Sequence, residues 1–374
     1  MAHDSASRET CPQELVDLIL DEVDPTDKVT LNSCALVARS FRPTSQKLIF
    51  SELTILPWKR DQYTILALQL RPTIWMQSVI SAGILSALNN VKSLKIRIRS
   101  WHHLDSTCEQ AIYSLIARSS LSSIKIDGAY FQTNPKLVAL LQCFPASLES
   151  ASFSKVFTNW TDLTSESIQF KSQLHLASLH LGTPDPTLFH WASRAVDLRC
   201  LQHLHTIFDD DAMDAVQPLL DGAINTETYH LSFWGCYSHT GSPNLGKMQR
   251  LRTLEISVEL NWMDILEVAG QGLDNPLDDA MLALATAPPT VEHLVLNLEI
   301  DNPNELHHFM GPATLNHLGE TLPALHDVAI RIVSSCDDDA ALQHGIRYVE
   351  AAFPRLHQRG MLTAIVVPPT GSGG

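Results

Sequence analysis

The chain has 374 residues, and its 26 basic and 41 acidic side chains give a formal net charge of −15. This acidic excess is expected to repel nucleic acid and anionic membrane surfaces, so neither is expected as a main partner. The sequence contains no run of about 18 apolar residues and no apolar signal-peptide core at its start, so we expect neither a membrane span nor a secretory leader.

The cysteines are odd in number, widely separated and never arranged as Cys-x-x-Cys. This distribution favours reduced thiols in the cytoplasm or nucleus over a disulfide framework or a zinc finger. The seven positions are Cys11, Cys34, Cys108, Cys143, Cys200, Cys236 and Cys336.

Residues 12–50 predict a short helical module. Leu15 and Ile19 lie on one apolar helix face, and Asp24 followed by Pro25 is a typical helix start. The helix that begins there carries a second apolar face over residues 31–38. Three helices in fewer than 40 residues cannot enclose a sizeable core, so the module must dock either on the rest of the chain, as a cap, or on a partner.

The same stretch carries eleven residues in a characteristic order and spacing: Pro12, Glu14, Leu15, Ile19, Leu31, Cys34, Leu36, Val37, Arg39, Leu48 and Phe50. In these residues it resembles the F-box motif in the form common to fungal F-box-like proteins. Cys11 replaces the usual opening leucine and Phe41 replaces the usual tryptophan.

This resemblance implies an adaptor role. An F-box docks on a Skp-type linker, which joins it to a cullin–RING (SCF-type) ubiquitin ligase. Apolar anchors in a helix-in-groove interface would supply the binding energy. The contact residues that the resemblance implies are Pro12, Leu15, Ile19, Leu36, Val37 and Phe41.

A hexad of the form apolar-x-x-apolar-x-apolar recurs through the rest of the chain. Its central copies are spaced at 23–30 residues, within or close to the period of a leucine-rich repeat, and its outer copies are further apart. The copies occupy residues 50–55, 91–96, 121–126, 148–153, 176–181, 201–206, 228–233, 251–256, 291–296 and 325–330, with 362–367 as a final candidate.

Helix-like stretches lie between the hexads, at 108–117, 135–141, 186–195 and 340–352. A strand followed by a helix, repeated about ten times, predicts a β-α solenoid. The predicted fold class is therefore α/β: an F-box module at 10–50, an irregular leucine-rich-repeat-like solenoid at 51–367 and a flexible tail at 368–374. We expect irregularity because the Asn or Cys that normally holds the turn is matched only by Cys236.

Alternate strand residues should line the concave wall of this solenoid and form a target-binding surface. Its charge is expected to run from basic, through histidine and aromatic, to acidic; the alternative is an ordinary solvated strand face. The candidate target-binding residues are Lys95, Arg97, Arg99, Lys125, His180, His203, His205, His230, Trp234 and Glu255, followed on the acidic side by Glu259, Glu299 and Asp301.

The histidines raise a metal-binding alternative, but no cysteine or carboxylate with ligand spacing completes a set, so no metal is expected. The acidic runs 209–211 and 337–339 are interpreted as helix caps and not as a catalytic pair. No P-loop, Gly-x-Ser-x-Gly, His-Glu-x-x-His or kinase motif occurs, so no enzyme activity and no cofactor are expected.

The leading functional prediction is a substrate-recognition adaptor of an SCF-type ligase. It would bind a Skp-type linker through the F-box and an unknown target protein through the solenoid. The alternative is a solenoid scaffold without any link to a ubiquitin ligase.

Overall fold

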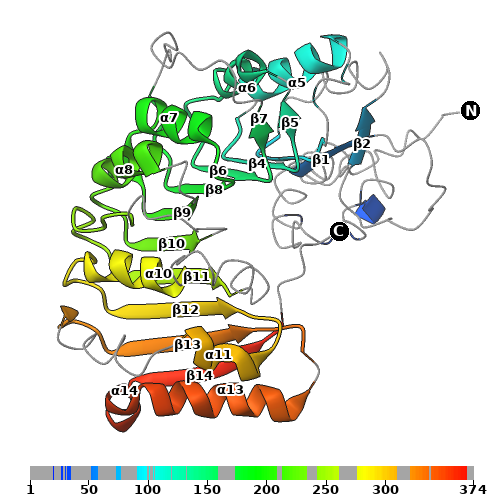
Figure 1. The fold of residues 1–374 in the computed structure, drawn as a ribbon. Helices are drawn as coiled ribbons and strands as arrows, with labels where there is room; N and C mark the ends of the chain where they lie inside the picture. The colour runs from blue at the N-terminus through cyan, green and yellow to red at the C-terminus, as the bar shows by residue number, and fades with distance from the viewer. Residues whose placement is uncertain are drawn as a thin grey trace, which may run out of the picture. The chain divides into compact units, whose positions relative to one another are not determined.

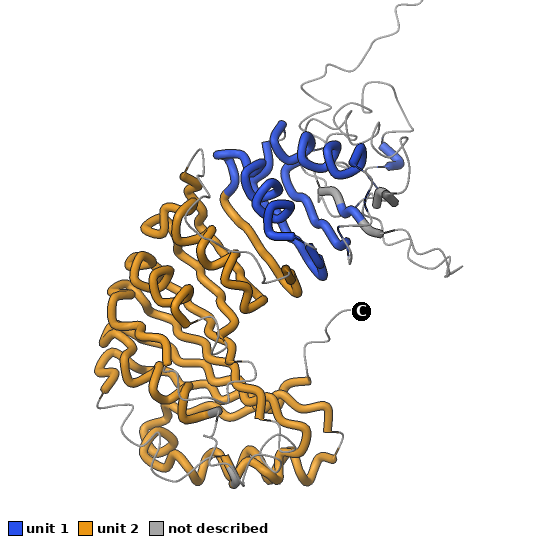
Figure 2. Tube along the Cα trace, turned by 45° about the horizontal axis from the view of Figure 1, so that its top comes forward, with its two compact units in different colours: residues 1–148 blue, residues 149–374 orange. Residues whose placement is uncertain are grey.

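The computed structural model describes residues 20, 27, 30, 32–34, 52–57, 73–76, 91–98, 101, 104, 106–118, 120–131, 133–158, 173–208, 213–233, 242–260, 276–309, 321–336 and 338–368. The chain divides into two compact units, Met1–Leu148 and Glu149–Gly374, which are coloured separately in Figure 2. In the main sheet of each unit the paired strands are parallel, and helices lie between many of them along the chain (Figure 1).

The candidate linker-binding residues Pro12, Leu15, Ile19, Leu36, Val37 and Phe41 all lie outside the described residues. In the described part of this stretch, Asp27 Oδ1 accepts a hydrogen bond of 3.0 Å from the backbone N–H of Thr30. Asp27 Oδ2 accepts another, of 2.6 Å, from the Thr30 hydroxyl. A side-chain acceptor three residues before a helical N–H is typical of a helix N-cap. The three-helix module itself stays a prediction.

Unit 1 contains a parallel sheet in the order β4-β3-β1-β2. Leu53, Leu94 and Ile124 occupy matching positions on β1, β3 and β4, as their hexads predict. Strand β2 pairs with β1 and belongs to none of the predicted hexads. The elements are β1 (Glu52–Pro57), β2 (Thr73–Met76), β3 (Ser93–Ile96), α5 (Ser106–Arg118), β4 (Ser123–Asp127), β5 (Tyr130–Phe131) and α6 (Asn134–Leu141).

Unit 2 contains a longer parallel sheet in the order β14-β13-β12-β11-β10-β9-β8-β6. Its helices lie along one side of these strands (Figure 2). The strands are β6 (Ser150–Ser154), β7 (Phe157–Thr158), β8 (Ser178–Gly182), β9 (His203–Phe208), β10 (Thr228–Phe233), β11 (Thr253–Glu259), β12 (His293–Glu299), β13 (Asp327–Val333) and β14 (Leu362–Val367). The helical segments are α7 (Pro186–Ala195), η4 (Leu198–Cys200), α8 (Met213–Gly222), α10 (Pro276–Ala285), η6 (Pro303–Glu305), α11 (Leu306–Phe309), α13 (Asp339–Ala352) and α14 (Pro354–Gln358).

The apolar hexad positions form ladders of buried side chains on the helix side of the unit 2 sheet. One ladder runs through Leu179, Leu204, Tyr229 and Leu254, which are in register and at most 2% exposed. Such apolar burial stabilises by about 25 cal/mol per Å² removed from water. Four aligned copies and uneven spacing further along the chain define an irregular, leucine-rich-repeat-like β-α solenoid.

This register corrects one predicted copy. Thr228 was placed at the first hexad position, but it pairs with His203 and Thr253, which are third positions. The hexad therefore begins at Thr226, whose side chain is fully buried, and Tyr229 fills the fourth position. A shift of two residues keeps every side chain on its predicted face, because the side-chain period of a strand is two.

The last predicted copy was wrong in register by an odd number of residues. Leu362 pairs with Val328, so it matches a fourth position and not a first one. An odd shift reverses the faces, and Ile365, predicted to be buried, is 40% exposed. Pairing with β13 sets this register, and the turn before β14 has Gly360 at φ +67° and a hydrogen bond from the Met361 backbone N–H to Leu356 O.

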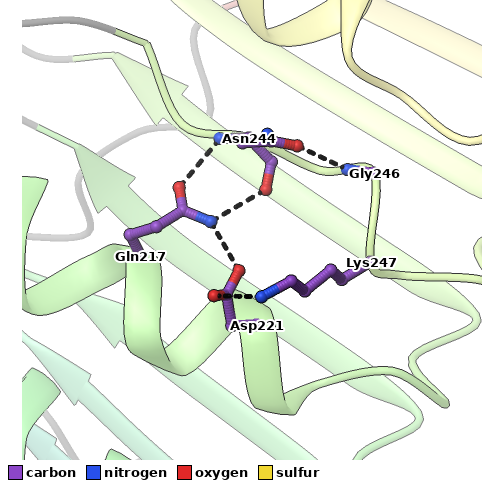
Figure 3. A network of polar contacts seen from close by, with 5 residues as sticks. All are labelled: Gln217, Asp221, Asn244, Gly246 and Lys247. Carbon is purple, nitrogen blue, oxygen red and sulfur yellow. Dashed lines mark hydrogen bonds and ion pairs between the residues drawn. The ribbon is translucent and has the colours of Figure 1, made fainter.

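Hydrogen bonds between α8 and residues 242–250 fasten neighbouring repeats together (Figure 3). Gln217 Nε2 donates to Asp221 Oδ1 at 2.8 Å and to Asn244 O at 3.1 Å, and Gln217 Oε1 accepts from Asn244 N at 2.9 Å. Asn244 Oδ1 accepts from the Gly246 N–H, and Lys247 Nζ lies 2.6 Å from Asp221 Oδ2. Hydrogen bonds from Lys247 and Gln217 hold the pKa of Asp221 below its usual value.

The four predicted helices are confirmed as α5, α6, α7 and α13, each with bounds within two residues of those predicted. Asp338 caps α13 as expected, with its Oδ1 accepting from Ala340 N at 2.9 Å. The other acidic run, 209–211, lies outside the described residues. In the described part of the chain, no helix has the length and apolar character needed to cross a membrane.

Candidate functional site

The candidate site is the side of each sheet opposite the helices, which we call the strand face. In unit 2 its central row consists of Ser152, His180, His205, His230 and Glu255, one residue from each of five adjacent strands. All five are half-buried. They point away from the buried apolar ladders because successive side chains of a strand alternate between its two faces.

His180, His205 and His230 form what we call the histidine row. The ring centroids of His180 and His205 are 4.1 Å apart, and the two rings meet edge to face at 87°. His205 and His230 are 4.0 Å apart and stacked at 18°. The parallel register produces these contacts, since matching residues of adjacent strands lie about 4.8 Å apart.

Serine hydroxyls contact each of these rings, from a neighbouring strand or, for Ser232 and His230, from the same strand. Ser154 Oγ lies 3.3 Å from His180 Nε2, and Ser232 Oγ lies 3.2 Å from His205 Nε2 and 3.3 Å from His230 Nε2. These contacts give each of the three imidazoles a hydroxyl neighbour, so the buried edges of the rings are not left without a polar partner.

A second polar group continues this network toward β13. Ser257 Oγ lies 2.8 Å from His230 Nε2 and accepts a hydrogen bond of 2.9 Å from Asn297 Nδ2. Asn297 Nδ2 also donates to Glu255 Oε1 at 2.6 Å, and Arg331 Nη1 lies 3.4 Å from that same oxygen. The network therefore links strands β6 to β13 within unit 2, and it holds Glu255 with two donors.

Burial keeps His205 and His230 neutral. Desolvation is the main cause that lowers the pKa of His205, to about 2, and the neighbouring His230 and His180 add to it. Desolvation also lowers the pKa of His230, with the charge of Glu255 opposing the effect and Arg331 supporting it. These two rings therefore act at neutral pH as uncharged hydrogen-bonding groups and flat contact surfaces.

The predicted residues around this row have different surroundings. His203 is exposed, one strand position before Leu204, and contributes to a neighbouring row of the same face. Trp234 lies outside the described residues. Sequence reasoning missed five polar residues, each of which directly follows a hexad: Ser154, Ser232, Ser257, Asn297 and Arg331. The first three lie two residues after members of the central row. Asn297 and Arg331 lie two residues after Val295 and Ala329, the positions that continue its register on β12 and β13.

The predicted basic residues lie in unit 1. Lys95 and Lys125 are register neighbours on β3 and β4 and share the strand face. Arg97 forms an ion pair with Asp127, with Nη2 2.7 Å and Nε 3.0 Å from Oδ2. The net positive charge around Lys95, Arg97 and Lys125 is therefore smaller than the sequence predicted, because the prediction did not include Asp127. Arg99 lies outside the described residues.

The histidines do not gather into a metal site in the described residues. No group of three or more His, Cys, Asp or Glu side chains is placed there to hold a metal ion. The rings contact one another face to face or edge to face, whereas metal ligation would need their nitrogens to converge on one point.

The Ser257–His230 pair has the spacing of a nucleophile and its base, but not the rest of such a site. Ser257 is only 8% exposed, and Asn297 already donates to its oxygen. In the part of the chain that the structure describes, no carboxylate is hydrogen-bonded to His230 to orient its ring, as an acid does in a catalytic triad.

Comparison of the sequence with protein-family models and with curated proteins gives no match. Among solved structures, the chain is similar to the leucine-rich repeat-containing protein LegL7 from Legionella pneumophila, with 17% sequence identity and a TM-score of 0.42. The similarity covers 78% of this chain and 88% of the LegL7 chain. The description of unit 2 as a repeat solenoid rests on the strand register and the buried ladders above.

Proposed function

We propose that the protein binds another protein on its strand face and catalyses no reaction. The observation that carries this proposal is the ordered polar row across β6 to β13. Its side chains stand on packed parallel strands and are held by hydrogen bonds, so a binding surface there would be pre-organised. The neutral imidazole rings of His205 and His230, beside charged groups, suit a partner with both flat apolar and polar parts.

The finer proposal is that the protein is the target-recognition adaptor of an SCF-type ubiquitin ligase. It rests on the resemblance of residues 10–50 to the F-box motif. In this proposal Leu15 and Val37 belong to the surface that docks on a Skp-type linker, and the strand face binds the target. Such a complex would operate in the cytoplasm or nucleus.

Mixing the full chain with a purified Skp-type linker tests the adaptor proposal. Wild type should co-elute with the linker, and the Leu15→Asp, Val37→Asp double variant should not, since charge on an apolar anchor disrupts a helix-in-groove interface. Exposed Leu282, which is 57% exposed on α10, offers a matched control as Leu282→Asp. Failure of wild type to bind, or equal binding by the double variant, would leave the scaffold alternative.

The strand-face proposal has its own test. Proteins that co-purify with the wild-type chain should be lost with His203→Glu and Lys125→Glu, which change two exposed strand-face positions. They should be retained with Leu282→Asp on the helix side. Retention of every partner by the strand-face variant would contradict the proposal. Labelling of Ser257 by a fluorophosphonate would contradict the non-catalytic part.

A further inference from the structure

A groove crosses the carboxyl ends of the unit 2 strands, beside the histidine row. It has a volume of about 260 Å³. Its accessible apolar part is formed by Phe157, which is 41% exposed, and by half-buried Ile207 on β9, with Phe233 at the end of β10 beneath them, 4% exposed. From β6 to β12 it spans five strand spacings, or about 24 Å along the sheet. That length matches roughly seven residues of an extended chain.

Two carboxylates form one end of this groove. Glu259 and Glu299 are the last residues of β11 and β12 and are register partners, so their side chains lie directly opposite one another. Like charges at such positions destabilise a sheet. A second, smaller cavity of about 140 Å³ continues from the same two residues toward Asp301.

No described group neutralises this pair. Among the residues that the structure describes, neither Glu259 nor Glu299 forms an ion pair with a lysine, arginine or histidine. Among the described residues that line the groove, Lys155 is the one cation; it follows β6 at the other end and forms an ion pair with neither carboxylate. Desolvation and then the charge of Glu259 raise the pKa of Glu299. By contrast, Glu255 on the same face is held by Asn297 and Arg331.

We propose that this groove binds an extended segment of a partner protein through an arginine side chain flanked by apolar residues. The guanidinium would lie between Glu259 and Glu299, where it relieves the repulsion between two carboxylates and can donate to both. The apolar neighbours would cover Ile207 and Phe157. The inference rests on the proposed protein-binding role of the strand face and names the chemistry of the partner.

Arginine fits this groove better than a small cation does. A metal ion or ammonium would satisfy the carboxylates but leave the apolar part uncovered, whereas an arginine-containing peptide carries both features. The planar guanidinium also presents several donors in a fixed arrangement, which suits two carboxylates on adjacent strands.

The test uses the full chain with ¹³C-labelled isoleucine methyl groups. The probe is the peptide acetyl-Ala-Leu-Arg-Leu-Ala-amide, and the matched probe replaces arginine with citrulline, which has nearly the same shape but no charge. Titration with the arginine peptide should shift the Ile207 methyl signal, and the citrulline peptide should bind at least tenfold more weakly. The Glu259→Gln, Glu299→Gln double variant should lose the preference for arginine, because it removes both charges and keeps the side-chain size.

The control variant is Glu149→Gln, Glu227→Gln. It removes two exposed carboxylates that precede β6 and β10, at the opposite end of the strands, and it should bind like wild type. Three results would overturn the inference: no Ile207 shift, equal shifts with the two peptides, or an arginine preference that survives in the Glu259, Glu299 variant. These three results would not bear on the proposed protein-binding role of the strand face, which the His203→Glu, Lys125→Glu variant tests.

Discussion

Acidification from pH 7 to about pH 5.5 should destabilise the protein through His205. In the folded chain the pKa of this imidazole is lowered from 6.5 to about 2, so it stays neutral in this range. In the unfolded chain it gains a proton below pH 6.5. The unfolded state then binds more protons than the folded state, and stability falls as the pH falls. The resulting loss is about 1 kcal/mol for this one group between these two pH values.

The measurement is the free energy of unfolding from urea titrations at both pH values, for wild type and for His205→Gln. Glutamine is neutral at both and can still hydrogen-bond Ser232, so the variant should lose about 1 kcal/mol less stability on acidification than wild type. His344→Gln on the exposed side of α13 is the matched control and should behave like wild type.

An equal pH dependence in wild type and His205→Gln would refute this reasoning. It would mean that the His205 ring is as accessible to protons in the folded chain as in the unfolded one, which contradicts its position between His180 and His230. The pKa of His230 is also lowered in the folded chain, so His230→Gln should also reduce the loss of stability on acidification.

Three further substitutions test the packing of the strands. Thr206→Val should cost about 1–3 kcal/mol in urea unfolding, because it removes the 2.7 Å partner of the fully buried Tyr229 hydroxyl. Gly182→Ala should lower the thermal midpoint and displace the His180 ring, since a Cβ there would lie 2.5 Å from His180 Nε2. Leu254→Ala should destabilise by about 2–5 kcal/mol in urea unfolding, since its side chain is fully buried in the apolar ladder.

Each of these three predictions has a result that would contradict it. For Thr206→Val, that result is a free energy of unfolding no lower than that of wild type. For Gly182→Ala, the contradicting observation is an unchanged His180 imidazole resonance together with an unchanged thermal midpoint. For Leu254→Ala it is a loss no larger than that of Leu282→Ala, which truncates an exposed leucine on α10.

The repeat was predictable because it depends on local pattern. Apolar residues at alternate positions indicated most of the strands, and the stretches between them indicated four of the helices. The prediction failed where neighbouring strands, and not the local pattern, set the register. Thr228 was displaced by two residues because buried Thr226 is polar and was not recognised as a hexad position. In β14 several apolar residues in succession allowed two registers, and pairing with β13 selected the other one.

The candidate site was predicted only in part, for a related reason. The hexads placed His180, His205 and His230 on one face, and the structure agrees with that placement. The serines, Asn297 and Arg331 were missed because their role depends on which strand lies next to which. Glu255 illustrates this point, since its partner Arg331 is 76 residues away in the sequence.

The net charge of −15 and the strand-and-helix period follow from the sequence alone, because counts and alternation require no knowledge of neighbours. Only the tertiary structure decided how the charges combine. It paired Arg97 with Asp127 and Glu255 with Arg331, and it left Glu259 and Glu299 facing each other across two strands. The physical reason is that the energies of charges and buried rings depend on distance and on exclusion of water, and both are set by strand register.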